Sequence, residues 1–318
     1  MYLAASVSNP IVAPFLILVE LQIGAWVRRA SAHSLTIETV RSTDPWTFGA
    51  DIVVGSVVVG GALGIVLGLA TWLSTRGGDA DPLFAALVAA ASDRYVSTSI
   101  TAWEFARGKM RGDPLYRTVI RGGALHPGGT LVDVGCGQGL ILALLAETAA
   151  AWRSGNWPGG AAPPVFDRLV GIETRRNVAA VARNALGADA TIVTEDARAH
   201  VPDRCRAVLF FDVLHMMPAE DQDRLLARMA DSLEPDGVML VREADAAAGW
   251  RFRAVRAGNR LKALLVGRWR QAFHFRTAEE WKQCFANAGF HVEARGTGEG
   301  TPFGNILFIL TRPPRASA

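Results

Sequence analysis

The hydrophobic positions of the chain follow different patterns in different regions. Residues 52–73 are apolar, carry no charge and contain five glycines. A run of this length can cross the ~30 Å hydrocarbon core of a membrane as a helix, whereas its glycines would weaken a helix in water. Small residues recur at every fourth position of the run, namely Ser56, Gly60, Gly64 and Gly68. Such a stripe lets membrane helices approach closely, so we predict a membrane-spanning helix at 52–73.

A second apolar stretch covers residues 3–27 and is interrupted by Pro10, Pro14 and Glu20. No basic residues precede it, which argues against a cleaved secretory signal. It forms either a second, proline-kinked span or a re-entrant segment packed on the first. Its spacing, N-P-x-x-x-P followed by E-x-Q-x-G, resembles part of a small uncharacterised bacterial membrane domain. The beginning is short for such a domain, which leaves open whether Met1 is the true start. We treat residues 1–76 as a membrane anchor.

From residue 83 onward, helical patterns alternate with short β-rich runs. The runs lie at 130–134, 168–172, 191–194, 206–212, 237–242, 290–296 and 305–311. Strands that alternate with helices indicate a mostly parallel sheet, and the last two runs, with no clear helix between them, indicate an antiparallel hairpin. We predict an α/β fold at 130–314, with a Rossmann-like, doubly wound, seven-stranded sheet. Cap or linker helices are expected at 83–129 and a surface insertion at the Ala-, Gly- and Pro-rich residues 151–166.

Composition narrows the kinds of site that we expect. Hydrophobic residues make up 50% of the chain and charged residues 20%, and the formal net charge is only +3. This balance gives little indication of an anionic partner. Cys136, Cys205 and Cys284 are far apart and form no C-x-x-C pattern. We therefore expect neither a disulfide framework nor a metal site.

The stretch LVDVGCGQGL (131–140) places a glycine-rich turn between a buried strand and a helix. This arrangement is the nucleotide-binding corner of a doubly wound sheet. Its spacing is G-x-G-x-G rather than the G-x-G-x-x-G of dinucleotide sites, and the G-K-[ST] of a Walker loop is missing. Preceded by Asp133, the motif resembles that of class I S-adenosylmethionine-dependent methyltransferases. The resemblance covers about residues 93–311.

The resemblance implies S-adenosyl-L-methionine as the cofactor, with its methionine end at the glycine turn. It assigns cofactor contacts to Asp133, Gly135, Cys136, Gly137, Gly139, Glu173, Thr174, Asp196, Ala197 and Asp212. Glu173 closes the second strand and would accept hydrogen bonds from the two ribose hydroxyls, while Asp196 and Ala197 would hold the adenine. Asp212 follows the fourth strand, beside the transferable methyl group. In LEPDGVMLVREAD, which matches the strand-five region, Asp236–Gly237 predicts a turn before the strand.

Three side chains are candidates for acting on the methyl acceptor. His215, just after strand four, is the first and His274 the second, because a neutral histidine can accept a proton at pH 7. Each histidine has the alternative role of a packed or capping residue. Asp212 would orient either the acceptor or the methionine amino group. The resemblance also implies that a helix in 102–117 caps the cofactor and lays Tyr116 near the site; a solvated helix end followed by a turn is the alternative.

Residues 249–276 contain no acid and are strongly basic. Their basic residues are Arg251, Arg253, Arg256, Arg260, Lys262, Arg268, Arg270 and Arg276, and their large aromatic residues include Trp250, Phe252, Trp269 and Phe273. The segment is either a solvated basic helix that covers the core or a lid that lies at a membrane interface, with arginines on anionic headgroups.

We expect a membrane-tethered methyltransferase that acts on oxygen or carbon of an apolar acceptor of lipid, acyl, polyene or quinone type. Because the cofactor is cytosolic, the catalytic part should face the cytoplasm from the inner leaflet of a bacterial inner membrane. Arg28, Arg29 and Arg41 would then lie outside, against the positive-inside tendency.

The alternatives are a nucleic-acid methyltransferase that uses the basic segment and a non-catalytic membrane scaffold that binds the cofactor. We do not expect the first, because strand four ends in Phe211-Asp212-Val213-Leu214 rather than [ND]-P-P-[FYW], and no RNA-binding module is recognisable.

Overall fold

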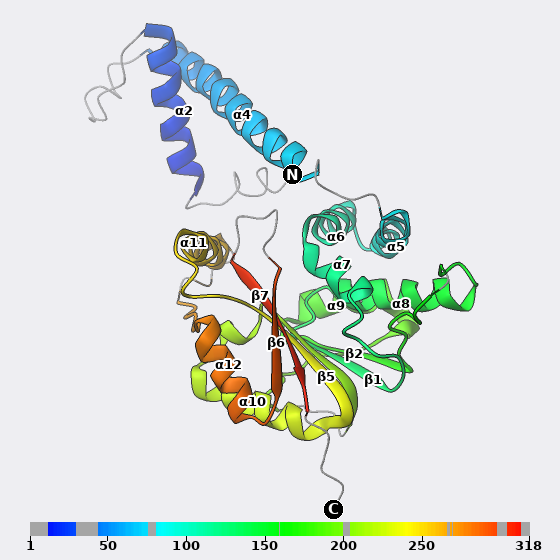
Figure 1. Cartoon of the computed structure of the whole chain (residues 1–318). Helices are drawn as coiled ribbons and strands as arrows, with labels where there is room; N and C mark the ends of the chain where they lie inside the picture. The colour runs from blue at the N-terminus through cyan, green and yellow to red at the C-terminus, as the bar shows by residue number, and fades with distance from the viewer. Residues whose placement is uncertain are drawn as a thin grey trace, which may run out of the picture. The chain divides into compact units, whose positions relative to one another are not determined.

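The computed structural model describes residues 12–29, 44–75, 81–158, 160–199, 204–265, 268, 270–297 and 304–312. The chain divides into two compact units, Met1–Gly78 and Asp79–Ala318 (Figure 1). The first contains helices α2 (Val12–Arg29) and α4 (Pro45–Thr75). The helices of the second are α5 (Pro82–Asp93), α6 (Ile100–Gly112), α7 (Pro114–Arg121), α8 (Leu140–Arg153), α9 (Arg176–Leu186), α10 (Ala219–Ser232), α11 (Trp250–Leu265) and α12 (Ala278–Asn287), with short 3₁₀ turns η1 (Gly187–Asp189) and η2 (Leu214–Met216). Its strands are β1 (Thr130–Val134), β2 (Arg168–Ile172), β3 (Thr191–Val193), β4 (Cys205–Phe211), β5 (Leu233–Ala244), β6 (His291–Gly296) and β7 (Asn305–Thr311).

The two helices of the N-terminal unit pack through glycines. A Cβ atom on Gly24 would lie 1.7 Å from the carbonyl oxygen of Asp51, and one on Gly55 would lie 1.7 Å from that of Glu20. Only glycine therefore fits at these two contacts. Of the expected stripe Ser56, Gly60, Gly64 and Gly68, the three glycines do not form this contact, because a Cβ on them would meet nothing within 4 Å in the described part of the chain.

The surface of the N-terminal unit exposes large apolar side chains, and one carboxylate is buried between its helices. Trp46 and Ile65 are 87% and 72% exposed, whereas Asp51 is fully buried. Arg28 Nη1 lies 2.7 Å from Asp51 Oδ1, and Arg29 pairs with the other carboxylate oxygen. A buried carboxylate is stable when it is paired in this way.

Among the described residues, α4 alone is long and apolar enough to cross a membrane, on length and composition, with its qualifying window at Pro45–Ala62. The predicted span 52–73 lies within α4. Of the predicted segment 3–27, residues 12–27 belong to α2, which packs on α4. Pro14 occupies the first turn of α2, where a missing N–H disturbs no helical hydrogen bond. Residues 3–11 lie outside the described residues.

The second unit contains one seven-stranded sheet in the order β3-β2-β1-β4-β5-β7-β6. Strands β1 to β5 are parallel, and β7 pairs antiparallel with both β5 and β6. This confirms the predicted mostly parallel sheet with a C-terminal antiparallel hairpin. Because the strand order reverses beside β1, the carboxyl ends of β1 and β4 form the edge at which ligands bind in such sheets.

The predicted turn at Asp236–Gly237 is wrong. Strand β5 already begins at Leu233, and its pairing with β4 shifts register between Cys205↔Leu233 and Ala207↔Val238. The Pro-Asp-Gly sequence is therefore absorbed as an irregularity inside the strand, because the pairing with β4 continues on both sides of it.

Successive residues of the strands face two different helical layers. Leu131, Leu209 and Leu240 belong to the core cluster that includes residues of α5 to α9. Val132, Val208 and Val241 belong to the cluster formed with α10 and α12. This alternation is the period of two that a pleated strand imposes, and it produces the layered arrangement of Figure 1.

The helices that precede the sheet begin at capping side chains. Asp81 accepts a hydrogen bond from the N–H of Phe84 at the start of α5, and Ser99 accepts one from Ala102 at the start of α6. Asp113 ends α6 and caps α7, which opens with Pro114. Short polar side chains satisfy the free N–H groups at these positions, so the expected cap region consists of three separate helices.

Candidate functional site

The glycine turn after β1 uses its three glycines for different purposes. Gly135, Gly137 and Gly139 have φ of 74°, 58° and 76°, a left-handed conformation that favours glycine. A Cβ on Gly135 would lie 2.6 Å from Val213, and one on Gly139 would lie 2.7 Å from Leu186. A Cβ on Gly137 would meet nothing within 4 Å. The outer glycines therefore allow close packing, and Gly137 presents its backbone to open space. Cys136 between them is buried, and burial raises the pKa of its thiol.

The turn is also held by Tyr95, which the sequence did not indicate. The hydroxyl of this fully buried residue donates a hydrogen bond to the carbonyl oxygen of Gln138 at 2.8 Å. The side-chain oxygen of Gln138 is buried and has no hydrogen-bond partner within the described residues. The turn thus contains an acceptor atom that the chain itself does not satisfy.

Asp133 and Glu173 lie beside the turn, at the ends of β1 and β2. Asp133 is 3% exposed, and its carboxylate makes no hydrogen bond within the described ranges; burial and the charge of Glu173 raise its pKa to about 7. Glu173 is 4% exposed, and one of its oxygens accepts a hydrogen bond from the N–H of Gly137 at 3.1 Å. The structure therefore brings together three of the predicted cofactor residues.

Arg175 donates hydrogen bonds to both carboxylate oxygens of Glu173. Its backbone N–H, Nε and Nη2 donate hydrogen bonds of 2.9, 3.0 and 2.9 Å to the two oxygens. Burial alone would raise the pKa of Glu173, but these bonds lower it overall. The hydroxyl of Thr174 lies 3.4 Å from the same carboxylate.

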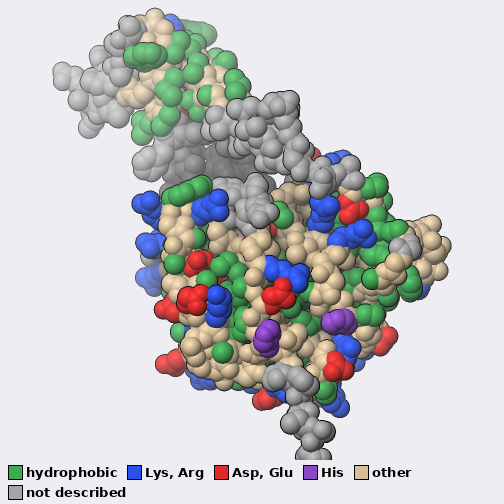
Figure 2. Space-filling view, viewed as in Figure 1, with side chains coloured by type: hydrophobic (Ala, Val, Ile, Leu, Met, Phe, Trp, Pro, Cys, Tyr) green, Lys and Arg blue, Asp and Glu red, His purple; other side chains and the backbone are tan. Residues whose placement is uncertain are grey.

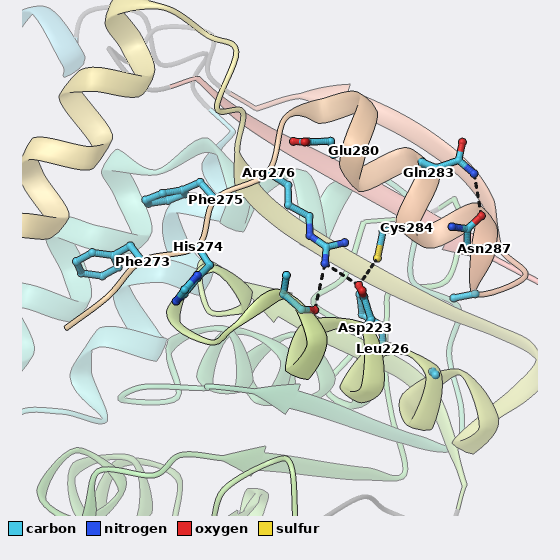
Figure 3. Close-up of a pocket in the computed structure, with 13 residues that line it drawn as sticks. Asp223, Leu226, Phe273, His274, Phe275, Arg276, Glu280, Gln283, Cys284 and Asn287 are labelled. Atoms are coloured by element: carbon cyan, nitrogen blue, oxygen red, sulfur yellow. Dashed lines mark hydrogen bonds and ion pairs between the residues drawn. The ribbon is translucent and has the colours of Figure 1, made fainter.

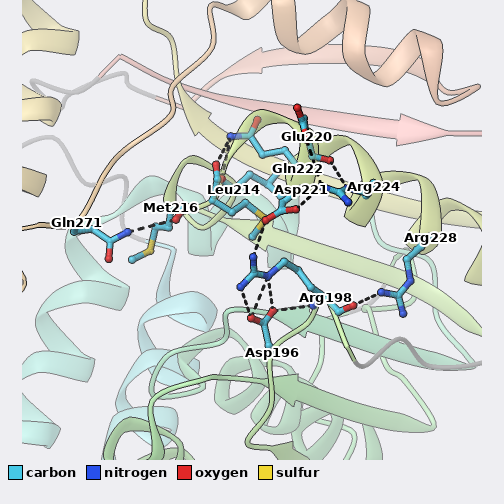
Figure 4. Close-up of polar contacts among 11 residues, drawn as sticks. Asp196, Arg198, Leu214, Met216, Glu220, Asp221, Gln222, Arg224, Arg228 and Gln271 are labelled. Atoms are coloured by element: carbon cyan, nitrogen blue, oxygen red, sulfur yellow. Dashed lines mark hydrogen bonds and ion pairs between the residues drawn. The ribbon is translucent and has the colours of Figure 1, made fainter.

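Asp196 and Ala197 follow β3, which is the neighbour of β2 in the sheet. Arg198 donates hydrogen bonds to both oxygens of Asp196, including one of 2.7 Å from Nη2, and its Nη1 reaches Asp221 of α10 at 2.6 Å (Figure 4). Ala197 is buried in the core cluster on that side. Asp196 is thus at the expected edge of the sheet, but its carboxylate is tied toward α10.

Asp212 adopts φ 57°, and no other non-glycine residue in the described part of the chain has a positive φ. Its backbone N–H donates to the carbonyl oxygen of Arg242 at 3.0 Å. Arg242 Nε donates to Asp212 Oδ1 at 3.1 Å, and Nη2 to the other oxygen. Arg242 was not among the site residues predicted from the sequence. An arginine inside the apolar run VMLVREA of a central strand is the signal that could have found it.

His215, in η2, is 5% exposed and lies against Glu243 at the end of β5. Its Nδ1 is 2.7 Å from one oxygen of Glu243, whose other oxygen accepts the N–H groups of Leu214 and His215. The imidazole stacks on Phe275, with ring centroids 4.7 Å apart. Glu243 was also missed, although it too interrupts an apolar strand. The pair fixes the ring of His215 in one orientation.

The structure places the two candidate histidines in different surroundings. The backbone N–H of His274 donates to the carbonyl oxygen of His215 at 2.7 Å, and Gln222 donates to the carbonyl oxygen of His274 at 2.9 Å. The ring of His274 lines a cavity of about 860 Å³ between α10 and α12 (Figure 3). In this structure His274 thus supports His215 through its backbone.

Most of the basic segment forms α11. Arg251, Arg253, Arg256 and Arg260 are exposed, and Figure 2 shows basic side chains gathered over this helix. Trp250 and Leu261 are also exposed, at 59% and 56%. Residues 266, 267 and 269, including the expected interfacial Trp269, lie outside the described residues.

Within the described ranges, no group of three or more His, Cys, Asp or Glu side chains is placed to hold a metal ion.

Comparisons with known proteins give one family match and several structures of similar fold. The model of a family described as a methyltransferase domain matches residues 103–295. Among solved structures, the pyocyanin biosynthetic protein PhzM is 20% identical, with a TM-score of 0.46, over 69% of this chain and 61% of that one. The magnesium protoporphyrin IX methyltransferase ChlM from Synechocystis PCC 6803, with bound SAH, is 16% identical, with a TM-score of 0.41, over 70% of this chain and 84% of that one. No curated protein matched the sequence.

Proposed function

Because the chain belongs to the family of S-adenosylmethionine-dependent methyltransferases, we propose that the unit Asp79–Ala318 methylates oxygen or carbon of an apolar acceptor of lipid, acyl, polyene or quinone type. The observation that carries this acceptor class is the N-terminal unit, whose long apolar helix α4 exposes large hydrophobic side chains such as Trp46, Val53 and Ile65, as a helix in contact with lipid does. The family match begins at residue 103, so the resemblance of the N-terminal stretch to a bacterial membrane domain stays a hypothesis.

The residues at the glycine turn fit S-adenosyl-L-methionine. The unpartnered carboxylate of Asp133 complements a positive charge, and the methionine end of the cofactor carries an ammonium group and a sulfonium. Gly137 leaves space for close approach, and Glu173 offers two acceptor oxygens for two ribose hydroxyls. When bound, the cofactor supplies a methyl group on a positively charged sulfur.

Arg175 has to leave Glu173 when ribose hydroxyls bind there, because it uses both carboxylate oxygens. Its side chain is 37% exposed, so it can turn toward solvent without disturbing the sheet. We infer that cofactor binding exchanges one set of hydrogen bonds to Glu173 for another.

Cofactor affinity is expected to rise as the pH increases from about 6 to 8. The pKa of Asp133 is raised to about 7, so at pH 6 most of this carboxyl is protonated and cannot attract a cation. Affinity should then fall about tenfold for each pH unit below this pKa, because binding has to release one proton. Calorimetric titration with S-adenosylmethionine at several pH values tests this, and Asp133→Asn, which has no proton to lose, should bind weakly without the pH dependence. An equally steep profile in the variant would contradict the role of Asp133.

The raised pKa of Asp133 also makes the folding stability of the cofactor-free protein depend on pH. A raised pKa means that the folded protein holds this proton more tightly than the unfolded chain. The stabilising contribution is complete below the ordinary value of 3.8 and is lost as the pH rises through about 7.

For a hydroxyl acceptor, we propose that His215 takes the proton. The bond from Nδ1 to Glu243 favours the tautomer with the proton on Nδ1, which makes Nε2 the basic nitrogen. Glu243 would also stabilise the imidazolium that forms. Asp212 would orient the acceptor or the methionine amino group, held in its left-handed conformation by Arg242.

The N-terminal unit would anchor the enzyme in a bacterial inner membrane, with the catalytic unit in the cytoplasm where the cofactor is made. The ion pairs of Arg28 and Arg29 with Asp51 reduce the net positive charge at that end of the hairpin. The proposed orientation places both arginines outside, against the positive-inside tendency, and rests on the cytoplasmic source of the cofactor. Residue Arg41 lies outside the described residues.

Helix α11 is proposed to rest on the anionic surface of the same membrane. The unit Asp79–Ala318, produced alone, is expected to bind vesicles that contain anionic lipid and to be released by salt, because exposed arginines interact with headgroups over a Debye length of only ~10 Å. Reversing the charge at Arg253, Arg256 and Arg260 should weaken binding at least about tenfold, at ~1 kcal/mol per basic residue. Arg224→Glu, at an exposed arginine of α10, is the matched control. Binding that ignores both salt and charge reversal would argue against this surface.

The experiment that tests the proposed acceptor is methylation of a membrane extract with a labelled methyl donor. We expect the label in the lipid-soluble fraction, and its loss with Glu173→Ala. Label confined to RNA would favour the nucleic-acid alternative, and binding of the cofactor without transfer to any fraction would favour the scaffold.

A further inference from the structure

A single arginine at the carboxyl edge of the sheet connects two parts of the chain that lie far apart in sequence. Arg242 is 3% exposed and is placed in the centre of the sheet, with Phe211 of β4 and Leu307 of β7 as its register partners. A buried charge in such a position is stable only when oppositely charged groups lie close to it. Arg242 has two such groups, both carboxylates.

The first partner, Asp212, belongs to the candidate site, and the second, Asp113, lies at the corner between α6 and α7. Arg242 Nη1 is 2.7 Å from both oxygens of Asp113, across 129 residues of sequence. Arg242 Nε and Nη2 bind Asp212. We call Asp113, Arg242 and Asp212 the ion triad, and α6 with α7 the cap.

Asp113 also organises the cap itself. Its carboxylate accepts the N–H of Leu115 at 3.1 Å and a hydrogen bond from Lys109 at 2.8 Å. Burial alone would raise the pKa of Asp113, but Arg242 and Lys109 lower it to about 2, so it is charged at any physiological pH. One carboxylate therefore ends α6, starts α7 and binds the sheet.

The triad lies close to the proposed cofactor site. The buried Tyr116 of α7 interacts electrostatically with Asp113 and Arg242 and also with Asp133 and Asp212. One cap side chain thus faces both the triad and Asp133, the carboxylate that precedes the glycine turn.

We propose that Arg242 is a positioning residue, which holds Asp212 beside the reacting methyl group and fixes the cap over the cofactor through Asp113. The proposal rests on the cofactor site described above. Opening the cap separates Asp113 from Arg242 and leaves the buried Arg242 with one carboxylate instead of two, so the triad favours the closed cap. Asp212 keeps its left-handed conformation because both its backbone and its side chain are bound to Arg242.

The variant Asp113→Asn distinguishes a role of the triad in holding the cap closed from a general role of Asp113 in folding. Asparagine still caps α7 but loses the charge that Arg242 binds, while the bond from Arg242 to Asp212 remains. The matched control is Asp81→Asn, at the N-cap of α5, where Asp81 pairs with Arg121 at 3.2 Å. Arg242→Met removes the centre of the triad and Arg242→Lys restores its charge; Arg206→Met controls for loss of an arginine from the neighbouring strand β4.

The measurement is hydrogen exchange in the full-length protein in detergent, with and without S-adenosylmethionine. Without cofactor, Asp113→Asn should speed exchange of the amides in 100–121 at least tenfold, leave β1 and α8 unchanged, and exceed the effect of Asp81→Asn. With cofactor, the same variant should release S-adenosylmethionine faster at a nearly unchanged association rate. Arg242→Lys should recover part of what Arg242→Met loses.

Cap amides that exchange as in the wild type, or equal effects of Asp113→Asn and Asp81→Asn, would overturn the proposal. So would equal effects of Arg242→Met and Arg206→Met. Failure of the wild type to bind S-adenosylmethionine would contradict the proposed cofactor site instead, and the cofactor-free exchange would still decide the role of the triad in closing the cap.

Discussion

Replacing Glu173 by alanine is expected to weaken S-adenosylmethionine binding at least about a hundredfold. The carboxylate is 4% exposed and can accept a hydrogen bond from each ribose hydroxyl. Hydrogen bonds to a charged group contribute about 1.5–3 kcal/mol each, and two of them correspond to a factor of about a hundred or more. The variant also removes the acceptor of the Gly137 N–H, which helps to shape the turn. Calorimetric titration of the full-length protein measures the change.

Two variants separate this effect from a loss of folding. Glu234→Ala removes a carboxylate that pairs with Arg206 near the start of β5, away from the carboxyl edge, and should leave affinity unchanged. Arg175→Ala removes the side chain that competes for Glu173, so its affinity should equal or exceed that of the wild type. Wild-type affinity in Glu173→Ala would exclude Glu173 as the ribose ligand.

Replacing His215 by alanine is expected to lower the rate of methyl transfer to a hydroxyl acceptor by about 10²–10⁴-fold, the usual range for loss of a general base. Cofactor affinity should change little, because the imidazole of His215 pairs with Glu243 at the end of β5. Glu243→Gln should also slow transfer, because a neutral amide does not stabilise an imidazolium. The rate of transfer into the labelled lipid fraction provides the measurement.

His274, the second candidate base, is compared with His215 in the same assay. His274→Ala should reduce transfer less than tenfold, because it keeps the backbone N–H that binds His215 and loses only a ring that lines the cavity between α10 and α12. His291→Ala, in the exposed edge strand β6, controls for histidine loss in general. A larger loss in His274→Ala than in His215→Ala would reverse the assignment.

The local features of the fold were predictable from the sequence. Strands β1, β2 and β7 have the predicted bounds, because runs of apolar residues end at turn-forming residues there. The glycine turn was also predictable, since three glycines at this spacing serve the left-handed backbone that β1 needs to enter α8. Turn chemistry at Asp236–Gly237 was misleading, because pairing with β4 overrides a local preference.

The long-range features were not predictable from the pattern. Arg242 and Glu243 belong to an apolar strand, and only the folded sheet shows that one meets Asp113, 129 residues away, and the other meets His215. The glycines at which the two N-terminal helices touch were also not predictable from the sequence. Periodicity selected Gly60, Gly64 and Gly68, but contact between two helices depends on the partner, and the structure uses Gly24 and Gly55. Patterns along one segment do not specify which side chains of another segment will face it.

A structure of the full-length protein with S-adenosylhomocysteine is the most direct test of the proposed cofactor site. We predict that both ribose hydroxyls donate hydrogen bonds to Glu173, that Arg175 has turned away, and that the amino group lies against Asp133. A ligand bound elsewhere, or a nucleoside at the glycine turn with Arg175 still paired to Glu173, would contradict the assignment.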